Sequence, residues 1–176
     1  MHKCISDMDI LITDRTKTRD ILPFLTTGNL KEVLDKVQSV PLDTPIPEMT
    51  VSDFNDLLSA PEDYTLRMAK DNRKALVFLG KCKDLYNQLE GFKRFMSRFE
   101  YKQSAEEKQA SNGIPFPSFG NQMVITLVET YHLHSVDEAG EMPVKAWMLA
   151  FEHNASQTLF SRRYNEIITK KSKMKK

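Results

Sequence analysis

The chain has 176 residues, 40% hydrophobic and 28% charged, a balance that supports one domain or a compact domain with extended arms. Two cysteines, Cys4 and Cys82, are too few for a disulfide framework or a thiolate zinc site, and no apolar run approaches the roughly 20 residues of a membrane-spanning helix. The formal net charge is +1, and the five lysines of the last seven residues leave 1 − 5 = −4 for residues 1–169. The sequence therefore indicates a mildly acidic body with a basic tail.

The first 49 residues are expected to form an extended arm, a short helix and a Pro-rich linker. The start has no apolar segment, so no signal peptide and a reducing, cytosol-like environment are expected. One short strand is possible at Ile10–Ile12. Asn29 is a candidate N-cap with Glu32 at the capping-box position, which predicts a short helix from that point. Residues 40–47 contain three prolines, which disfavour both helix and central strand.

Residues 50–101 are predicted to form a short helix followed by a long amphipathic helix from Pro61 to Tyr101. Proline and two acids at the start favour a helix N-terminus, and about 40 residues would span about 60 Å. Gly80 and Gly91 lie inside it, where either could mark a bend. Apolar residues recur at alternating spacings of three and four, interrupted at Asp71. They are Met68, Ala75, Phe78, Cys82, Leu85, Leu89, Phe92, Met96 and Phe99.

This apolar seam has two interpretations. It can be the core face of a helix in an antiparallel bundle, or an exposed seam for self-association. Further apolar residues widen its first half, which favours core there, whereas basic residues flank the narrower part beyond Leu89. We therefore expect the partner surface in that second part. The candidate partner-binding residues are Phe92, Lys93, Arg94, Phe95, Arg98 and Phe99.

The second half of the chain is predicted to be helical after a break. Residues 102–117 are expected to form a polar loop and an extended segment, because the apolar pattern is lost and two prolines follow. Residues 118–169 are predicted to hold three helices, over 118–134, near 136–140 and over 143–168, the first two capped by Ser118 and Ser135. The long central helix is expected to pack against the first and last of these.

Residues 170–176 form the basic tail, and solvated disorder is the leading interpretation of it. The alternatives are contact with phosphates or with an anionic partner surface. The candidate anion-binding or nucleic-acid-binding residues are Lys170, Lys171, Lys173, Lys175 and Lys176.

Signals for catalysis or metal binding are weak. Glu129 and His132 have the Glu-x-x-His spacing of di-iron bundles, with His134 and His153 as possible additions, but such sites need a second motif and further glutamates. Cys82 falls on the apolar seam and is expected to be a small buried hydrophobe rather than a nucleophile. The sequence shows no phosphate-binding loop or nucleophile elbow. We expect a protein without catalytic residues, metal or cofactor.

Four short segments of the C-terminal part carry a family resemblance. They are GIPFPSF (Gly113–Phe119), VDEA (Val136–Ala139), PVKAW (Pro143–Trp147) and RYNEI (Arg163–Ile167). Together they resemble small helical virion or assembly proteins of tailed phages that infect Bacteroides-type hosts. The resemblance covers about a third of the chain. It implies location in the virion, and in the host cytoplasm during assembly, but it assigns no role to any residue.

The sequence thus predicts a mainly α fold, a helical bundle around one long central helix with an irregular N-terminal third. The leading functional hypothesis is a non-enzymatic structural protein of a tailed-phage virion, either a head–tail connector ring, an adaptor or an internal cargo protein. Its partners would be other virion or assembly proteins and further copies of itself, without a membrane. The first alternative is a cytosolic adaptor or assembly factor that binds nucleic acid through the basic tail and the 93–98 flank. The second is a small helical enzyme.

Overall fold

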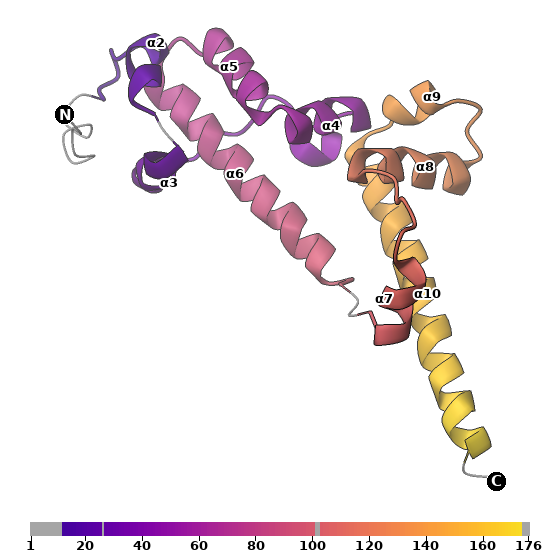
Figure 1. The fold of residues 1–176 in the computed structure, drawn as a ribbon. Coiled ribbons are helices and arrows are strands. Elements are labelled where there is room, and N and C mark those ends of the chain that lie inside the picture. The colour runs from indigo at the N-terminus through magenta and orange to yellow at the C-terminus, as the bar shows by residue number, and fades with distance from the viewer. Residues whose placement is uncertain (1–11, 26, 101–102, 174–176) are drawn as a thin grey trace. The chain divides into compact units, whose positions relative to one another are not determined.

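The computed structural model describes residues 12–25, 27–100 and 103–173 and has the mainly α fold that the sequence predicts (Figure 1). The chain forms two compact units. Unit 1 contains the described residues up to Met49 together with Asp53–Lys93, and unit 2 contains Thr50–Ser52 and the described residues from Arg94 onward. Within the described ranges, β pairing is limited to two isolated bridges, Lys17 with Lys74 and Thr50 with Pro143.

The N-terminal part of unit 1 is more helical than predicted. It contains α2 (Thr18–Ile21), the 3-10 helix η2 (Leu22–Phe24), α3 (Thr27–Lys36) and a second 3-10 helix, η3 (Ile46–Glu48). The prediction that Asn29 caps a helix is wrong, because α3 begins at Thr27 and the Asn29 amide donates back to the Phe24 carbonyl at 2.8 Å. The possible strand at Ile10–Ile12 lies mostly outside the described residues, and Ile12 itself has no strand structure.

The long helix predicted from Pro61 to Tyr101 is two helices. After α4 (Val51–Ser59), α5 spans Pro61–Asp71 and α6 spans Ala75–Ser97. Asn72 has extended backbone, and its side-chain amide donates to the Met68 carbonyl at 2.8 Å, which satisfies an acceptor at the end of α5. Arg73 and Lys74 then pair with the segment before α2, which takes these two residues out of any helix. The interruption of the seam at Asp71 marks this break.

The Pro-rich linker lies along α6 and is held there by side chains. The Asp84 carboxylate accepts from the Leu42 amide at 3.0 Å, and the Gln88 side-chain oxygen accepts from the Ile46 amide at 2.7 Å. Lys83 donates to the Val37 carbonyl at 2.8 Å. Because prolines deny this segment regular backbone pairing, polar groups on α6 take the place of a neighbouring strand or helix.

Gly80 allows this close approach. A Cβ at position 80 would lie 2.5 Å from Val40 Cγ2 and 2.8 Å from the Gln38 carbonyl oxygen. The Val40 amide also donates to the Gly80 carbonyl at 3.0 Å. The glycine that the sequence marked as a possible bend is therefore the point where the linker contacts the helix backbone, whereas Gly91 faces open space.

Unit 2 contains four helices in the described residues: α7 (Ala105–Ser111), α8 (Phe119–Tyr131), α9 (Val136–Gly140) and α10 (Val144–Lys173). The predicted polar loop over 102–117 is wrong at α7, which a full capping box between Ser104 and Glu107 initiates. The predicted caps Ser118 and Ser135 are confirmed. The disordered tail is also wrong in its first part, because Lys170–Lys173 continue α10.

The core of unit 2 is centred on Trp147. Its indole stacks on Phe151 with ring centroids 5.1 Å apart and meets Phe119 edge to face at 5.5 Å. Met123 and Leu127 of α8 are fully buried in the same unit. Near the start of α4, the Val51 amide donates to the Met142 carbonyl at 2.9 Å, so this short stretch belongs to unit 2 rather than to unit 1.

Candidate interaction surfaces

The residues predicted to bind a partner along 92–99 make contacts within the chain. Phe92 packs on Phe54 with ring centroids 4.9 Å apart. Phe95 and Phe99 both pack on Phe151, at 6.1 and 5.5 Å. All three rings of this segment are half-buried. Their partners are therefore the chain's own aromatics, and binding of another molecule here stays a prediction.

The basic residues of the same segment are also engaged or exposed. Arg98 donates to Glu152 at 2.7 Å, and its guanidinium lies 5.4 Å from the Phe95 ring centroid and 5.3 Å from that of Phe99. Lys93 is exposed and donates to Glu90 at 2.7 Å, an interaction that raises its pKa. Arg94 is exposed. Arg98 thus covers the aromatic cluster rather than presenting a free cation.

The weak metal candidates do not come together. Glu129, His132, His134 and His153 are all exposed, and His132 adopts the left-handed conformation (φ 54°) that ends α8. Among the residues that the structure describes, no group of three or more potential metal ligands occurs. The Cys82 thiol is buried as part of the apolar face of α6, and this desolvation raises its pKa to about 12. Cys82 therefore has the character of a buried hydrophobe that the sequence predicts.

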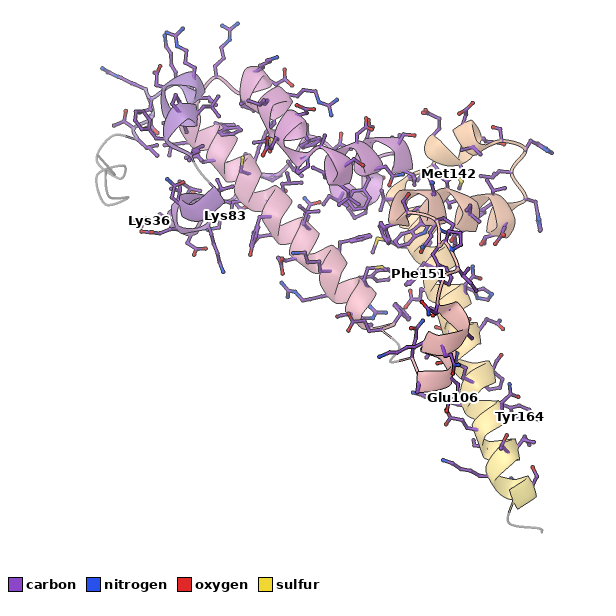
Figure 2. The ribbon with its side chains drawn as sticks, in the orientation of Figure 1. Lys36, Lys83, Glu106, Met142, Phe151 and Tyr164 are labelled. Carbon is purple, nitrogen blue, oxygen red and sulfur yellow. The ribbon has the colours of Figure 1, made fainter. Side chains whose placement is uncertain are left out.

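An exposed apolar face runs along α10, and the sequence did not predict it. Leu149, Phe160, Tyr164 and Ile167 are 64%, 69%, 55% and 52% exposed. At 100° per residue these four positions fall within about 60° around the helix, so they form one face, which we call the α10 face. Phe160 and Tyr164 stack on each other at 6.3 Å. The outer part of the α10 face lies where α10 extends beyond α7. Tyr164 is labelled in this outer part, and Phe151 is labelled on the packed half of the helix (Figures 1 and 2).

The surroundings of the α10 face are strongly basic. Residues 160–173 contain five basic residues and one acidic residue, a net charge of 5 − 1 = +4. The predicted anion-binding residues Lys170 and Lys171 are exposed on this helical end. Lys175 and Lys176 lie outside the described residues, and the side chain of Lys173 is not described.

An acidic surface of opposite character lies on α4 and α5. Between Leu42 and Leu66 the chain has six acidic residues and no lysine or arginine. Four of these acids are exposed on the two helices and define what we call the acidic surface: Asp53, Asp56, Glu62 and Asp63. Leu58, on the same helices, is 43% exposed. At 100° per residue Leu58 lies about 140° or more around α4 from Asp53 and Asp56, so the acidic surface offers charge rather than apolar area.

The sequence contained signals for these surfaces that spacing arguments passed over. Phe160, Tyr164 and Ile167 recur at intervals of four and three within the helix predicted over 143–168, with Arg162 and Arg163 between them. The sequence shows that residues 43–66 contain acids and no lysine or arginine, but it does not show that four of these acids are exposed on α4 and α5.

Comparisons with known proteins add no relative. No protein-family model, no curated protein and no solved structure matches this chain. None of the described helices is both long and apolar enough to cross a membrane.

Proposed function

We propose that this chain is a non-enzymatic structural subunit that assembles head to tail, with the α10 face of one copy bound to the acidic surface of the next. The setting that we propose is a tailed-phage virion, as a connector ring, an adaptor or an internal cargo protein, on the basis of the resemblance described above. The observation that carries the proposal is the exposed α10 face. Exposed apolar residues at helical spacing are typical of helices that dock onto another protein.

Magnitudes favour a contact that uses charge as well as apolar burial. The four side chains are between 52% and 69% exposed, so burying what remains contributes about 4–7 kcal/mol, at the low end of the cost of association, about 4–15 kcal/mol. The apolar face alone therefore gives a marginal complex. Attraction between the +4 end of α10 and the acidic surface would supply the additional stabilisation and orient the encounter.

Charge also decides which surface meets which. Two α10 ends placed against each other would bring two net charges of +4 together, and like charges across an interface are unfavourable. The acidic surface of another copy has the opposite sign. Such a contact joins two different surfaces of one chain, so it leads to a closed ring or an open filament rather than a symmetric dimer.

The experiment is light scattering on two variants, alone and mixed. Phe160→Asp/Ile167→Asp disrupts the α10 face, and Asp56→Lys/Asp63→Lys brings the four residues of the acidic surface from −4 to a net charge of zero. The wild type is expected to form oligomers that dissociate as salt rises from about 0.1 to 1 M, where the Debye length falls from about 10 to 3 Å. Each variant alone should be monomeric. A mixture should give only heterodimers, because one intact interface remains per pair.

Matched controls carry the same chemical change elsewhere. Phe116→Asp/Val136→Asp changes two apolar residues that are 67% and 65% exposed, and Glu129→Lys/Glu141→Lys reverses two exposed acids of unit 2. Both controls should assemble as the wild type does. A wild-type chain that stays monomeric at every concentration would overturn self-assembly. Oligomers that survive Asp56→Lys/Asp63→Lys would overturn the head-to-tail contact.

A further inference from the structure

A basic hollow lies in unit 1 between α2 and the end of α5, independent of the surfaces discussed above. Its volume is about 590 Å³. Five of its lining residues are cations: Lys17, Arg19, Lys70, Arg73 and Lys74. None of the described residues that line it carries a carboxylate. These cations come from two sequence segments more than 50 residues apart, so no run of basic residues in the sequence indicates the hollow.

Backbone pairing fixes the two segments beside each other. Lys17 and Lys74 form an antiparallel bridge, and the Thr18 amide donates to the Arg73 carbonyl at 2.9 Å. On the other side of this bridge, the Ala75 amide donates to the Thr16 carbonyl at 2.9 Å. The buried Thr18 hydroxyl donates to the Asn72 carbonyl. The same pairing that interrupts the helix between α5 and α6 therefore brings the cations together.

The charge of the hollow favours an anion. All five cationic side chains are exposed and line one hollow, where like charges repel within the screening distance of about 10 Å. Asp20, the acid next to Arg19, contacts it at 3.4 Å and offsets one of the five charges. The four remaining charges favour a ligand with several negative charges over a single carboxylate. Arginine and lysine are also the side chains that bind phosphate oxygens.

Part of the lining of the hollow is apolar. Leu22, Leu66 and Ala69 belong to the lining, and the volume lies within the range of small-molecule sites. A lining that combines apolar side chains with five cations suits a ligand with a flat organic body and attached phosphates. We infer that the hollow binds a nucleoside phosphate, either as a free nucleotide or as part of a single-stranded nucleic acid.

The test measures binding of two probes to the full chain by fluorescence anisotropy. The probes are fluorescently labelled ATP and a labelled 12-nucleotide single-stranded DNA. Arg73→Glu/Lys74→Glu should weaken binding at least tenfold, because each charge-assisted hydrogen bond lost corresponds to about a tenfold change or more. Lys17→Gln/Lys70→Gln, which only neutralises, should weaken it less. Lys31→Glu, at an exposed lysine on α3, is the control and should bind as the wild type does.

The outcomes separate the sources and the site. Tight ATP binding without DNA binding identifies a free nucleotide, whereas DNA binding that ATP displaces identifies a strand seated in the same hollow. Either result supports the inference if the Arg73→Glu/Lys74→Glu variant no longer binds the probe while its circular dichroism is unchanged. Binding of neither probe would overturn it. The inference would also be overturned if Arg73→Glu/Lys74→Glu bound the probes as the wild type does while deletion of residues 170–176 abolished binding. Oligomer formation is measured separately, so failure here leaves the head-to-tail proposal intact.

Discussion

The two long helices, α6 and α10, have similar apolar spacing but different surroundings. In α6 the apolar face is buried over its first half, with Ala75, Phe78 and Leu79 inaccessible to solvent. In α10 the equivalent spacing continues beyond the packed half into residues that are more than half exposed, such as Phe160 and Tyr164. Spacing therefore identifies a face in both helices, but it does not identify what covers that face.

What covers α6 is partly the Pro-rich linker, and α6 carries the polar groups that hold it. Lys81 is 8% exposed and pairs with Asp43 at 2.5 Å, and Asp84 accepts from the linker backbone. The end of α10 carries basic residues around an apolar face instead. In α6, polar residues beside the apolar face hold the segment of the chain that covers it, and α10 has no such contacts to a linker among the described residues.

Truncating one phenylalanine on each helix tests this difference in burial and should give the largest effect. Phe78→Ala should lower the free energy of unfolding by about 3–5 kcal/mol, because the side chain is fully buried. Phe160→Ala should change it by less than about 0.5 kcal/mol in the monomer, because the ring is 69% exposed. Chemical denaturation of dilute protein, followed by circular dichroism, measures both. Equal losses would mean that the end of α10 belongs to a core.

The two glycines of α6 test the docked linker. Gly80→Ala should cost about 1–3 kcal/mol, because the new methyl group meets Val40 and the Gln38 carbonyl. Gly91→Ala should instead stabilise by up to about 1 kcal/mol, because its Cβ meets open space and alanine favours helix. Thermal melting of the two variants gives opposite shifts. A neutral Gly80→Ala would show that the linker does not lie against α6.

The sequence predicted local features more successfully than long-range ones. Caps at Ser118 and Ser135 and the start of α4 at Val51 follow from residue types within one turn, and the structure has them. The prediction of a single helix from Pro61 to Tyr101 is wrong because the break between α5 and α6 depends on pairing between Lys17 and Lys74. Helical periodicity in a window around residue 72 contains no information about a segment that precedes it by more than 50 residues.

The interaction surfaces show the same limit. The candidate set at 92–99 was chosen for aromatic and basic residues in alternation, yet Phe95 and Phe99 find Phe151 of the same chain. The basic hollow joins Lys17 with Arg73 and Lys74 across a backbone bridge that no motif announces. The prediction of a loop where α7 forms is wrong for a different reason. It rests on the loss of apolar periodicity, whereas the capping box of Ser104 and Glu107 starts a helix without an apolar face.

A smaller effect is expected from the polar groups that hold the linker. Asp84→Ala removes the acceptor for the Leu42 amide and for Gln88, which donates to Asp84 at 2.7 Å. The loss should be about 1–2 kcal/mol, since the site is half-buried. Hydrogen exchange should quicken at the Leu42 amide, whereas Asn87→Ala on the exposed side of α6 should leave it unchanged. Unaltered exchange in Asp84→Ala would mean that other contacts hold the linker.

The least disruptive test uses Cys82 as a reporter of the closed face of α6. Burial raises its pKa from 9.0 to about 12, which lowers the thiolate fraction at pH 8 by a factor of about 10³. In a Cys4→Ser variant, iodoacetamide should therefore alkylate Cys82 about a thousandfold more slowly in the folded protein than in urea. Mass spectrometry over time measures the rate.

The matched control places a thiol on the α10 face. Tyr164→Cys in a Cys4→Ser/Cys82→Ala background should react at the rate of an exposed thiol in the monomer, and more slowly once copies assemble head to tail. The raised pKa of Cys82 also has a consequence for stability. Because the folded state holds the proton more tightly, this stabilisation is complete below pH 9 and is lost as pH rises toward 12. Rapid alkylation of Cys82 at pH 8 would show that the face of α6 opens, and the contrast between the two helices would then be one of dynamics rather than of burial.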